Sequence, residues 1–277
     1  MAGCTSGRDE PGKPAAESKA AGGASTSPSG TAGPSASASP SGTAAVDIDP
    51  AKLPRTASQA AALVRDVIAQ PSAFGPDTVR RSPYESDPRR WAVLGDDCVW
   101  EQRALPKDVL ASLTRHYEIP ASGGRGPLTL SAVVTVHRTA EQADWENAEV
   151  LEEMMRCPSQ LMRSGEVLTD LTDVPSALGD SGNGFADDSL TEMGMYTSER
   201  LGGPYPYVWE QTRVGQFTLA VSAKGAKDWS KSDLFDQLRD PHVRMRSGLR
   251  GAIERDTPAG TGSPSVSESA VTKGSRR

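Results

Sequence analysis

Residues 205–224 read YPYVWEQTRVGQFTLAVSAK, two runs rich in β-branched and aromatic side chains on either side of a glycine. This pattern predicts a β-hairpin, because alternating apolar residues suit a half-buried strand and glycine suits a tight turn. We place a three-residue loop at 213–215, with Gly215 in the left-handed region. The hairpin is therefore expected to form part of an antiparallel sheet.

The register of this hairpin follows from its apolar pattern. A three-residue loop sets Trp209 opposite Leu219, whereas a two-residue loop sets it opposite Ala220 and divides the apolar side chains between both faces. The first register is favoured because it gathers them on one face. The residues that then share this face are Tyr207, Trp209, Phe217, Leu219 and Val221.

The remaining elements are read from periodicity and from helix-capping residues. Further strands are expected at residues 91–94, 98–103, 128–137, 166–172 and 193–198. Helices are expected to start at Thr56, Pro106, Thr139 and Ser230 or Ser232, and a closing helix at 243–253. The helix after Pro106 rests on the helical spacing of Val109, Leu110, Leu113 and Tyr117. Helices that flank antiparallel strands with few parallel crossovers predict an α+β fold.

Composition divides the chain into three parts. Residues 1–52 consist mainly of Ala, Gly, Ser, Thr and Pro, which cannot bury enough surface to offset the entropy of ordering. Residues 257–277 are similar, so both ends are expected to be disordered. Residues 53–256 are expected to form a single globular domain.

The chain begins Met1-Ala2-Gly3-Cys4, which resembles the end of a bacterial lipoprotein signal, where small residues precede a lipidated cysteine. The charged and apolar regions of such a signal are missing, so we expect a start further upstream or a trimmed chain. The resemblance implies lipid attachment at Cys4, by palmitate or a similar acyl chain, and anchoring of an exported protein to the cell membrane. The alternative is an incidental cysteine in the linker.

The other two cysteines, Cys98 and Cys157, form an even pair in a domain expected outside the cytosol. They are therefore predicted to form a disulfide, with two separate thiols as the alternative. A zinc site is not expected, because there is no Cys-x-x-Cys and the three histidines are scattered. No metal or other cofactor is predicted.

Three segments carry a wider resemblance: 97–100 (DCVW), 139–158 from TAEQADW to RCP, and 213–215 (RVG). In these the chain resembles a group of actinobacterial surface lipoproteins, and more distantly the extracellular sensor domain of a mycobacterial serine/threonine kinase. That resemblance implies an α+β domain with a broad cleft and a ligand-sensing role. The kinase-type sensor carries two disulfides, whereas this domain can form one.

Candidate chemical groups are few. Known hydrolase, metalloprotease and nucleotide-binding motifs are missing from the sequence. Each remaining candidate has a structural alternative: a capping role, a solvated loop or a place in the core. The candidates are Asp96 and Asp97 as an acidic pair, Asp187 and Asp188 as part of a calcium loop, His116 or His137 as a base, and Tyr205, Tyr207 and Trp209 as a binding stripe.

The sequence thus favours a non-enzymatic, lipid-anchored surface protein with a ligand-binding or sensing domain. Its partner is expected to be a small ligand, a wall component or another envelope protein. A net charge of -6 argues against nucleic acid. The alternatives are an envelope hydrolase whose site assembles only in three dimensions, and an assembly factor for a membrane complex.

Overall fold

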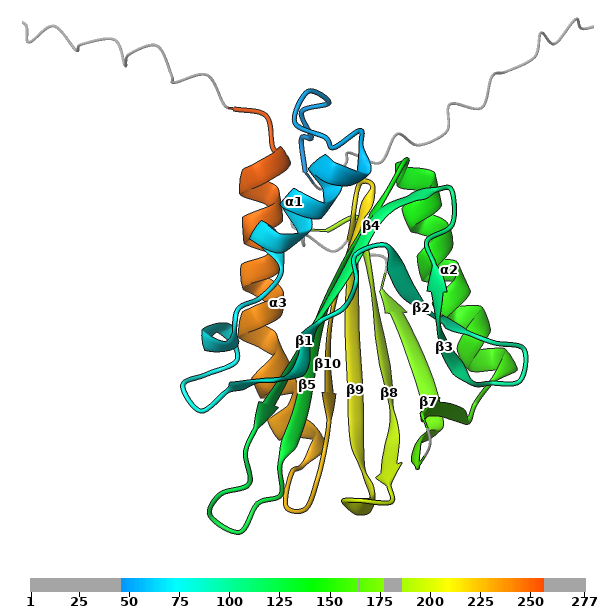
Figure 1. The fold of residues 1–277 in the computed structure, drawn as a ribbon, viewed down its shortest axis with the longest axis vertical. Coiled ribbons are helices and arrows are strands. Elements are labelled where there is room, and N and C mark those ends of the chain that lie inside the picture. Colours follow the sequence, from blue (N-terminus) through cyan, green and yellow to red (C-terminus); the bar gives the residue numbers. More distant parts are fainter. Residues whose placement is uncertain (1–45, 164, 177–185, 257–277) are drawn as a thin grey trace, which may run out of the picture. The chain divides into compact units, whose positions relative to one another are not determined.

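The computed structural model describes residues 46–163, 165–176 and 186–256, which form an eight-stranded antiparallel sheet with three α-helices (Figure 1). The α+β prediction is confirmed. The strand order is β1-β4-β5-β10-β9-β8-β7-β6, and β2 and β3 form a separate hairpin. The elements in chain order are α1 (Ala57–Val67), the short 3₁₀ helix η1 (Pro71–Ala73), β1 (Val79–Glu85), β2 (Arg90–Leu94), β3 (Trp100–Ala104), β4 (Val109–Ile119), β5 (Leu128–His137), α2 (Ala140–Arg156), β6 (Gln160–Arg163), β7 (Glu166–Ser176), β8 (Asp188–Ser198), β9 (Gly202–Val214), β10 (Phe217–Lys224) and α3 (Lys231–Ile253).

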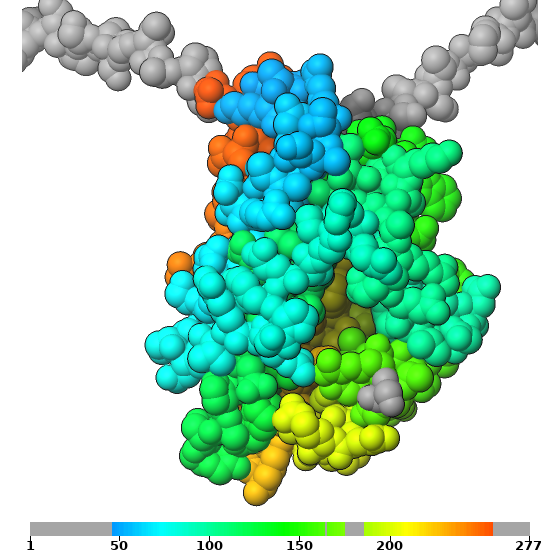
Figure 2. All heavy atoms as spheres, in the orientation of Figure 1, coloured from blue at the N-terminus to red at the C-terminus, as the bar shows by residue number. Residues whose placement is uncertain are grey.

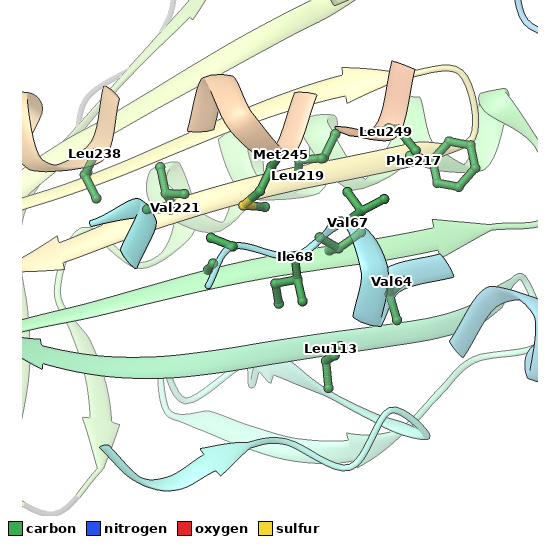
Figure 3. Packing of buried hydrophobic residues seen from close by; sticks show 14 of the residues in the cluster. Val64, Val67, Ile68, Leu113, Phe217, Leu219, Val221, Leu238, Met245 and Leu249 are labelled. Carbon is green, nitrogen blue, oxygen red and sulfur yellow. The ribbon is translucent and has the colours of Figure 1, made fainter. Parts of the chain in front are cut away.

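The hydrophobic core lies between one face of the sheet and the helices α1 and α3, and we call this the core face. Every second residue of β4, β5 and β10 points into it, and α1 and α3 cover it with apolar side chains (Figure 3). The side chains seen there include Val64, Val67, Ile68, Leu113, Phe217, Leu219, Val221, Leu238, Met245 and Leu249. This packing fixes which residues remain for the opposite face.

Helix α1 begins and ends as expected. The Thr56 hydroxyl accepts a hydrogen bond from the Gln59 backbone amide, and the Gln59 side-chain oxygen accepts one from the Thr56 backbone N–H, which completes the predicted capping box. At the other end, the buried Arg115 donates to the carbonyls of Ile68 and Ala69. A buried cation here satisfies carbonyls that the helix itself leaves unpaired.

The helix predicted to start at Ser230 or Ser232 and the closing helix predicted at 243–253 form a single helix in the structure. Ser230 caps α3, which continues without a break through Pro241 to Ile253. Proline removes one backbone hydrogen bond and normally breaks a helix. Here Leu234 and Leu238 before it and Met245 after it are all fully buried against the core face, so packing holds both halves on a single helix.

The helix predicted after Pro106 is wrong, because residues 109–119 form β4 between β1 and β5. The apolar spacing in this segment fits either structure. In the strand, Leu113 and Tyr117 point to the core face and His116 points away from it. Pairing with two neighbouring strands outweighs the local preference for helix.

The predicted register of the β9–β10 hairpin is also wrong. Its loop is Gly215 and Gln216, and Trp209 pairs with Ser222 instead of Leu219. Gly215 does take a positive φ of 54°, as expected. The error has a physical cause: β9 carries apolar side chains on both faces, so the argument from a single apolar stripe chose the wrong partners.

The folded domain begins earlier than the predicted boundary at Leu53. Val46 is 2% exposed and belongs to the core cluster. Ile48 forms an antiparallel bridge with Glu254, and the Asp49 amide donates to the carbonyl of Ile253 at 2.9 Å. Residues 46–52 therefore belong to the domain and not to the linker. The rest of the predicted linker and the predicted tail lie outside the described residues.

Candidate ligand-binding cleft

The face of the sheet opposite the core face is hollowed. Figure 2 shows this hollow between β1 on one side and the β2–β3 hairpin on the other, with β9 and β10 on its floor. Helix α2 contacts β5, β7, β9 and β10 above the same face. We call this hollow the cleft.

A row of polar and amphipathic side chains crosses the floor of the cleft. Strand register places them side by side, one from each of six adjacent strands, all on the face opposite the core. In order from β4 to β7 they are His116, Ser131, Ser222, Trp209, Glu192 and Asp173. Ser131 and Ser222 share a hydrogen bond of 2.6 Å. A fully packed sheet face would carry apolar residues at these central positions, so the row marks a surface built for polar contacts.

The β7–β8 end of the row is acidic. Burial raises the pKa of Glu192 to about 8, and nearby Asp173 adds to that rise, while the Tyr207 hydroxyl donates a hydrogen bond to Glu192. Burial also raises the pKa of Asp173 to about 6 and that of Glu153, on α2, to about 7. Carboxyl groups that are both desolvated and close together favour their neutral forms. Near neutral pH this end therefore both donates and accepts hydrogen bonds.

The surroundings of His116, at the β4 end of the row, are basic. Burial lowers the pKa of His116 to about 4, helped by the positive charges of Lys224, Arg81 and Arg163. The imidazole is therefore neutral near pH 7. Arg163 and Lys224 both pair with Glu166, Lys224 at 3.2 Å. Arg163 and Lys224 thus share one carboxylate, and Arg81 adds a further positive charge near His116.

The Lys224–Glu166 pair also reports on the shape of the sheet. Lys224 lies on β10 and Glu166 on β7, with β9 and β8 between them. In a flat sheet three strand spacings amount to about 14 Å. The extended Lys and Glu side chains cover part of this interval, and the curl of the sheet (Figure 1) brings their charged groups to 3.2 Å. The pair thus closes the lower end of the cleft.

Helix α2 closes the upper end through polar contacts. Glu146 accepts from Thr218 at 2.8 Å and lies 2.5 Å from Nε2 of the buried His137. Asn147 bonds with Gln211 at 2.6 Å and with Asp188. The helix begins at Thr139 as predicted, Glu146 faces the sheet, and Met155 is 79% exposed. The reason is that α2 rests on a polar face.

The predicted disulfide between Cys98 and Cys157 is confirmed. It joins the turn of the β2–β3 hairpin to the end of α2. Next to it, the Trp100 indole donates to Gln160 at 2.8 Å, and Val99 forms a parallel bridge with Leu161. These three links fix the hairpin as a wall of the cleft.

A second cavity, of about 260 Å³, lies between α3 and the strands β8 and β9, and we call it the α3 cavity. In its wall, His242 Nε2 lies 3.1 Å from the Thr212 hydroxyl, and His242 Nδ1 lies 3.5 Å from the Glu210 carboxylate. This order resembles a catalytic triad. Thr212 is only 2% exposed, however, so its hydroxyl is enclosed and the chain of contacts holds His242 in place. The cavity is lined by Ser189, Leu190, Thr191, Glu210, Gln211, Thr212, Phe235, Arg239, His242, Val243 and Arg246.

The structure places most of the candidate residues from the sequence in different parts of the domain. Asp96 and Asp97 lie in the exposed hairpin turn, and His137 is enclosed beneath α2. Asp187 and Asp188 pair with Arg213. The neighbouring residues 182–184 of the expected calcium loop lie outside the described residues, as does Cys4. Of the predicted stripe, Tyr207 and Trp209 do lie on the cleft side, next to Leu168 and Tyr196.

Sequence reasoning missed Glu192, Asp173 and Lys224 altogether. The sequence did hold a signal for the polar floor of the cleft. Apolar and mostly polar residues alternate along 128–137, and this alternation places Thr129, Ser131 and Thr135 on the face away from the core. Within the described ranges, no three His, Cys, Asp or Glu side chains are grouped to hold a metal ion. No helix there combines the length and apolarity that a bilayer crossing requires. Comparison of the chain with protein-family models gave no match, and comparison with curated proteins gave none either.

Proposed function

We propose that this chain is the ligand-binding or sensing domain of a lipid-anchored extracytoplasmic protein, and that the cleft holds a small polar ligand. The observation that carries the proposal is the polar row across the cleft floor, from His116 to Asp173. A ligand with hydrogen-bonding groups can replace the water that these side chains otherwise need. The resemblance to surface lipoproteins supports the same role.

Binding without catalysis is favoured by the pairing of the groups in the cleft. The only serine hydroxyls in the row bond to each other, and neither bonds to His116 within the described part of the chain. A nucleophile needs a base within hydrogen-bond reach. His137 has a carboxylate and a hydroxyl nearby, but both Thr218 and His137 contact the carboxylate of Glu146 and not each other.

The test is a thermal-shift screen with amino acids, mono- and disaccharides and short carboxylic acids. Ser131→Leu fills the floor of the cleft, while Thr197→Leu adds similar bulk at an exposed strand position away from it. A cleft ligand should raise the Tm of the wild type and of Thr197→Leu, since binding to the folded state alone stabilises it. It should bind Ser131→Leu at least tenfold more weakly. Equal binding by both variants would place the ligand elsewhere.

The anchor is tested separately. Intact-mass analysis of the protein isolated from its native membrane should show acyl mass on Cys4, and Cys4→Ser should release the domain into the soluble fraction. An unmodified Cys4 in membrane-bound protein would remove lipid attachment from the proposal and leave the cleft unaffected.

A further inference from the structure

Helix α3 presents a basic stripe to the α3 cavity. Arg239, His242 and Arg246 are spaced by three and four residues, so they lie on one side of the helix. Phe235 and Val243 stand beside them, and strands β8 and β9 form the opposite wall. The cavity lies on the core side of the sheet and is separate from the cleft.

The guanidinium of Arg246 is the least satisfied group in this cavity. No hydrogen bond or ion pair joins it to another side chain in the described ranges, and its Nε is enclosed by protein. Burial lowers the pKa of Arg246, and the nearby charge of Glu210 only partly opposes this. A guanidinium carries five donors, and a buried donor without an acceptor destabilises the folded protein. The guanidinium donors of arginine form a planar fork, and an oxyanion is the ligand that best matches this geometry.

Glu210 does not supply the missing partner. Its carboxylate lies 3.5 Å from Nδ1 of His242, whose pKa burial keeps lowered. Arg239 pairs with Asp236 at 3.0 Å, but both side chains are about two-thirds exposed. Such a surface pair contributes little and rearranges at small cost. The lining thus has two guanidinium groups against one carboxylate.

The other lining residues limit the ligand further. Ser189 and Thr191 offer hydroxyl donors, while Phe235 and Val243 form an apolar wall. A volume of about 260 Å³ suits a molecule of a few non-hydrogen atoms. We propose that the α3 cavity is a second binding site, which holds the oxyanion of a small organic acid between Arg239 and Arg246, with a short apolar body against Phe235 and Val243.

The test uses NMR spectra of the arginine Nε–H groups of the full chain, titrated with butyrate and with methyl phosphate at constant ionic strength. The Arg246 signal should shift and saturate with at least one of them. Arg246→Met, in which binding is followed at the Arg239 signal, should bind at least tenfold more weakly. Arg244→Met, an exposed arginine on the same helix, should leave it unchanged.

Saturation with butyrate alone assigns a carboxylate, and saturation with methyl phosphate alone assigns a phosphate ester. If Arg246→Met does not fold, Arg246→Lys replaces it, and its point charge should still bind several-fold more weakly than the guanidinium fork. The proposal is overturned if neither compound saturates, or if Arg244→Met weakens binding as much as Arg246→Met. Neither result bears on the cleft.

Discussion

Glu192 is the residue whose surroundings say most about the cleft floor. It is 6% exposed, it neighbours Asp173 across the strand pair, and it accepts from the Tyr207 hydroxyl. A carboxyl group in this position disfavours folding once it must ionise. Its presence therefore costs stability that an apolar residue would not, which is typical of sites kept for binding.

Glu192→Gln should reveal this cost as a pH dependence. Burial raises the folded-state pKa of Glu192 from 4.5 to about 8, so the folded protein holds a proton that the unfolded chain releases. Stability therefore falls as pH rises from about 4.5 to about 8. The variant should match the wild type near pH 4 and exceed it by roughly 2–4 kcal/mol at pH 8. Urea unfolding at both pH values measures this.

Glu199→Gln is the matched control, because Glu199 is an exposed residue in the turn between β8 and β9. It should leave the unfolding free energy unchanged within about 0.5 kcal/mol at either pH. A Glu192→Gln variant that is equally stabilised at pH 4 and pH 8 would mean that ionisation of this carboxyl is not the cause.

At the scale of elements, the β2–β3 hairpin depends on its covalent link. The hairpin has a separate two-stranded sheet, and isolated hairpins are marginally stable in water. The disulfide joins residues 59 apart in sequence. Reduction should therefore loosen the wall of the cleft before it affects the core.

The Cys98→Ala, Cys157→Ala double variant should lose about 4 kcal/mol of stability, from the chain entropy that the cross-link removes in the unfolded state. Hydrogen exchange should accelerate most at the amides of β2 and β3, such as that of Val93, and least in β5 and β10. Uniform acceleration across both sheets would show that the bridge stabilises the whole domain and not the hairpin in particular.

Elements bounded by local signals could be predicted from the sequence. The caps at Thr56 and Thr139 placed two helices correctly, a cap at Ser230 or Ser232 placed the start of α3, and the alternation of 128–137 placed β5. Elements set by tertiary contacts could not. Residues 109–119 match helical spacing yet pair as a central strand, and Pro241 is kept inside α3 by burial on both sides.

The candidate site could be predicted from the sequence even less well than the fold. Its acidic end joins Asp173 and Glu192 from adjacent strands, and its basic end joins Lys224 to Glu166, 58 residues away, only because the sheet curls. No spacing rule connects residues so far apart. Of the predicted site features, the disulfide follows from simple counting, and the aromatic stripe correctly pointed to Tyr207 and Trp209.

At the scale of the whole domain, the two faces of the sheet have different roles. Its core face packs against α1 and α3 and supplies hydrophobic stability, while its other face carries a polar row beneath α2 and the hairpin. A sheet stabilised from one side can leave its other side open to solvent. The cleft can therefore vary without loss of the fold.

The central claim, that the hollowed face binds a ligand, is tested most directly at the indole N–H of Trp209. Trp209 lies on the cleft floor, whereas the indole of Trp229 donates to the Gly126 carbonyl outside the cleft. In NMR spectra of the full chain, assigned with Trp209→Phe, a ligand from the thermal-shift screen should shift the Trp209 signal in a saturable way and leave Trp229 in place. A stabilising ligand that shifts Trp229 and not Trp209 would contradict the claim.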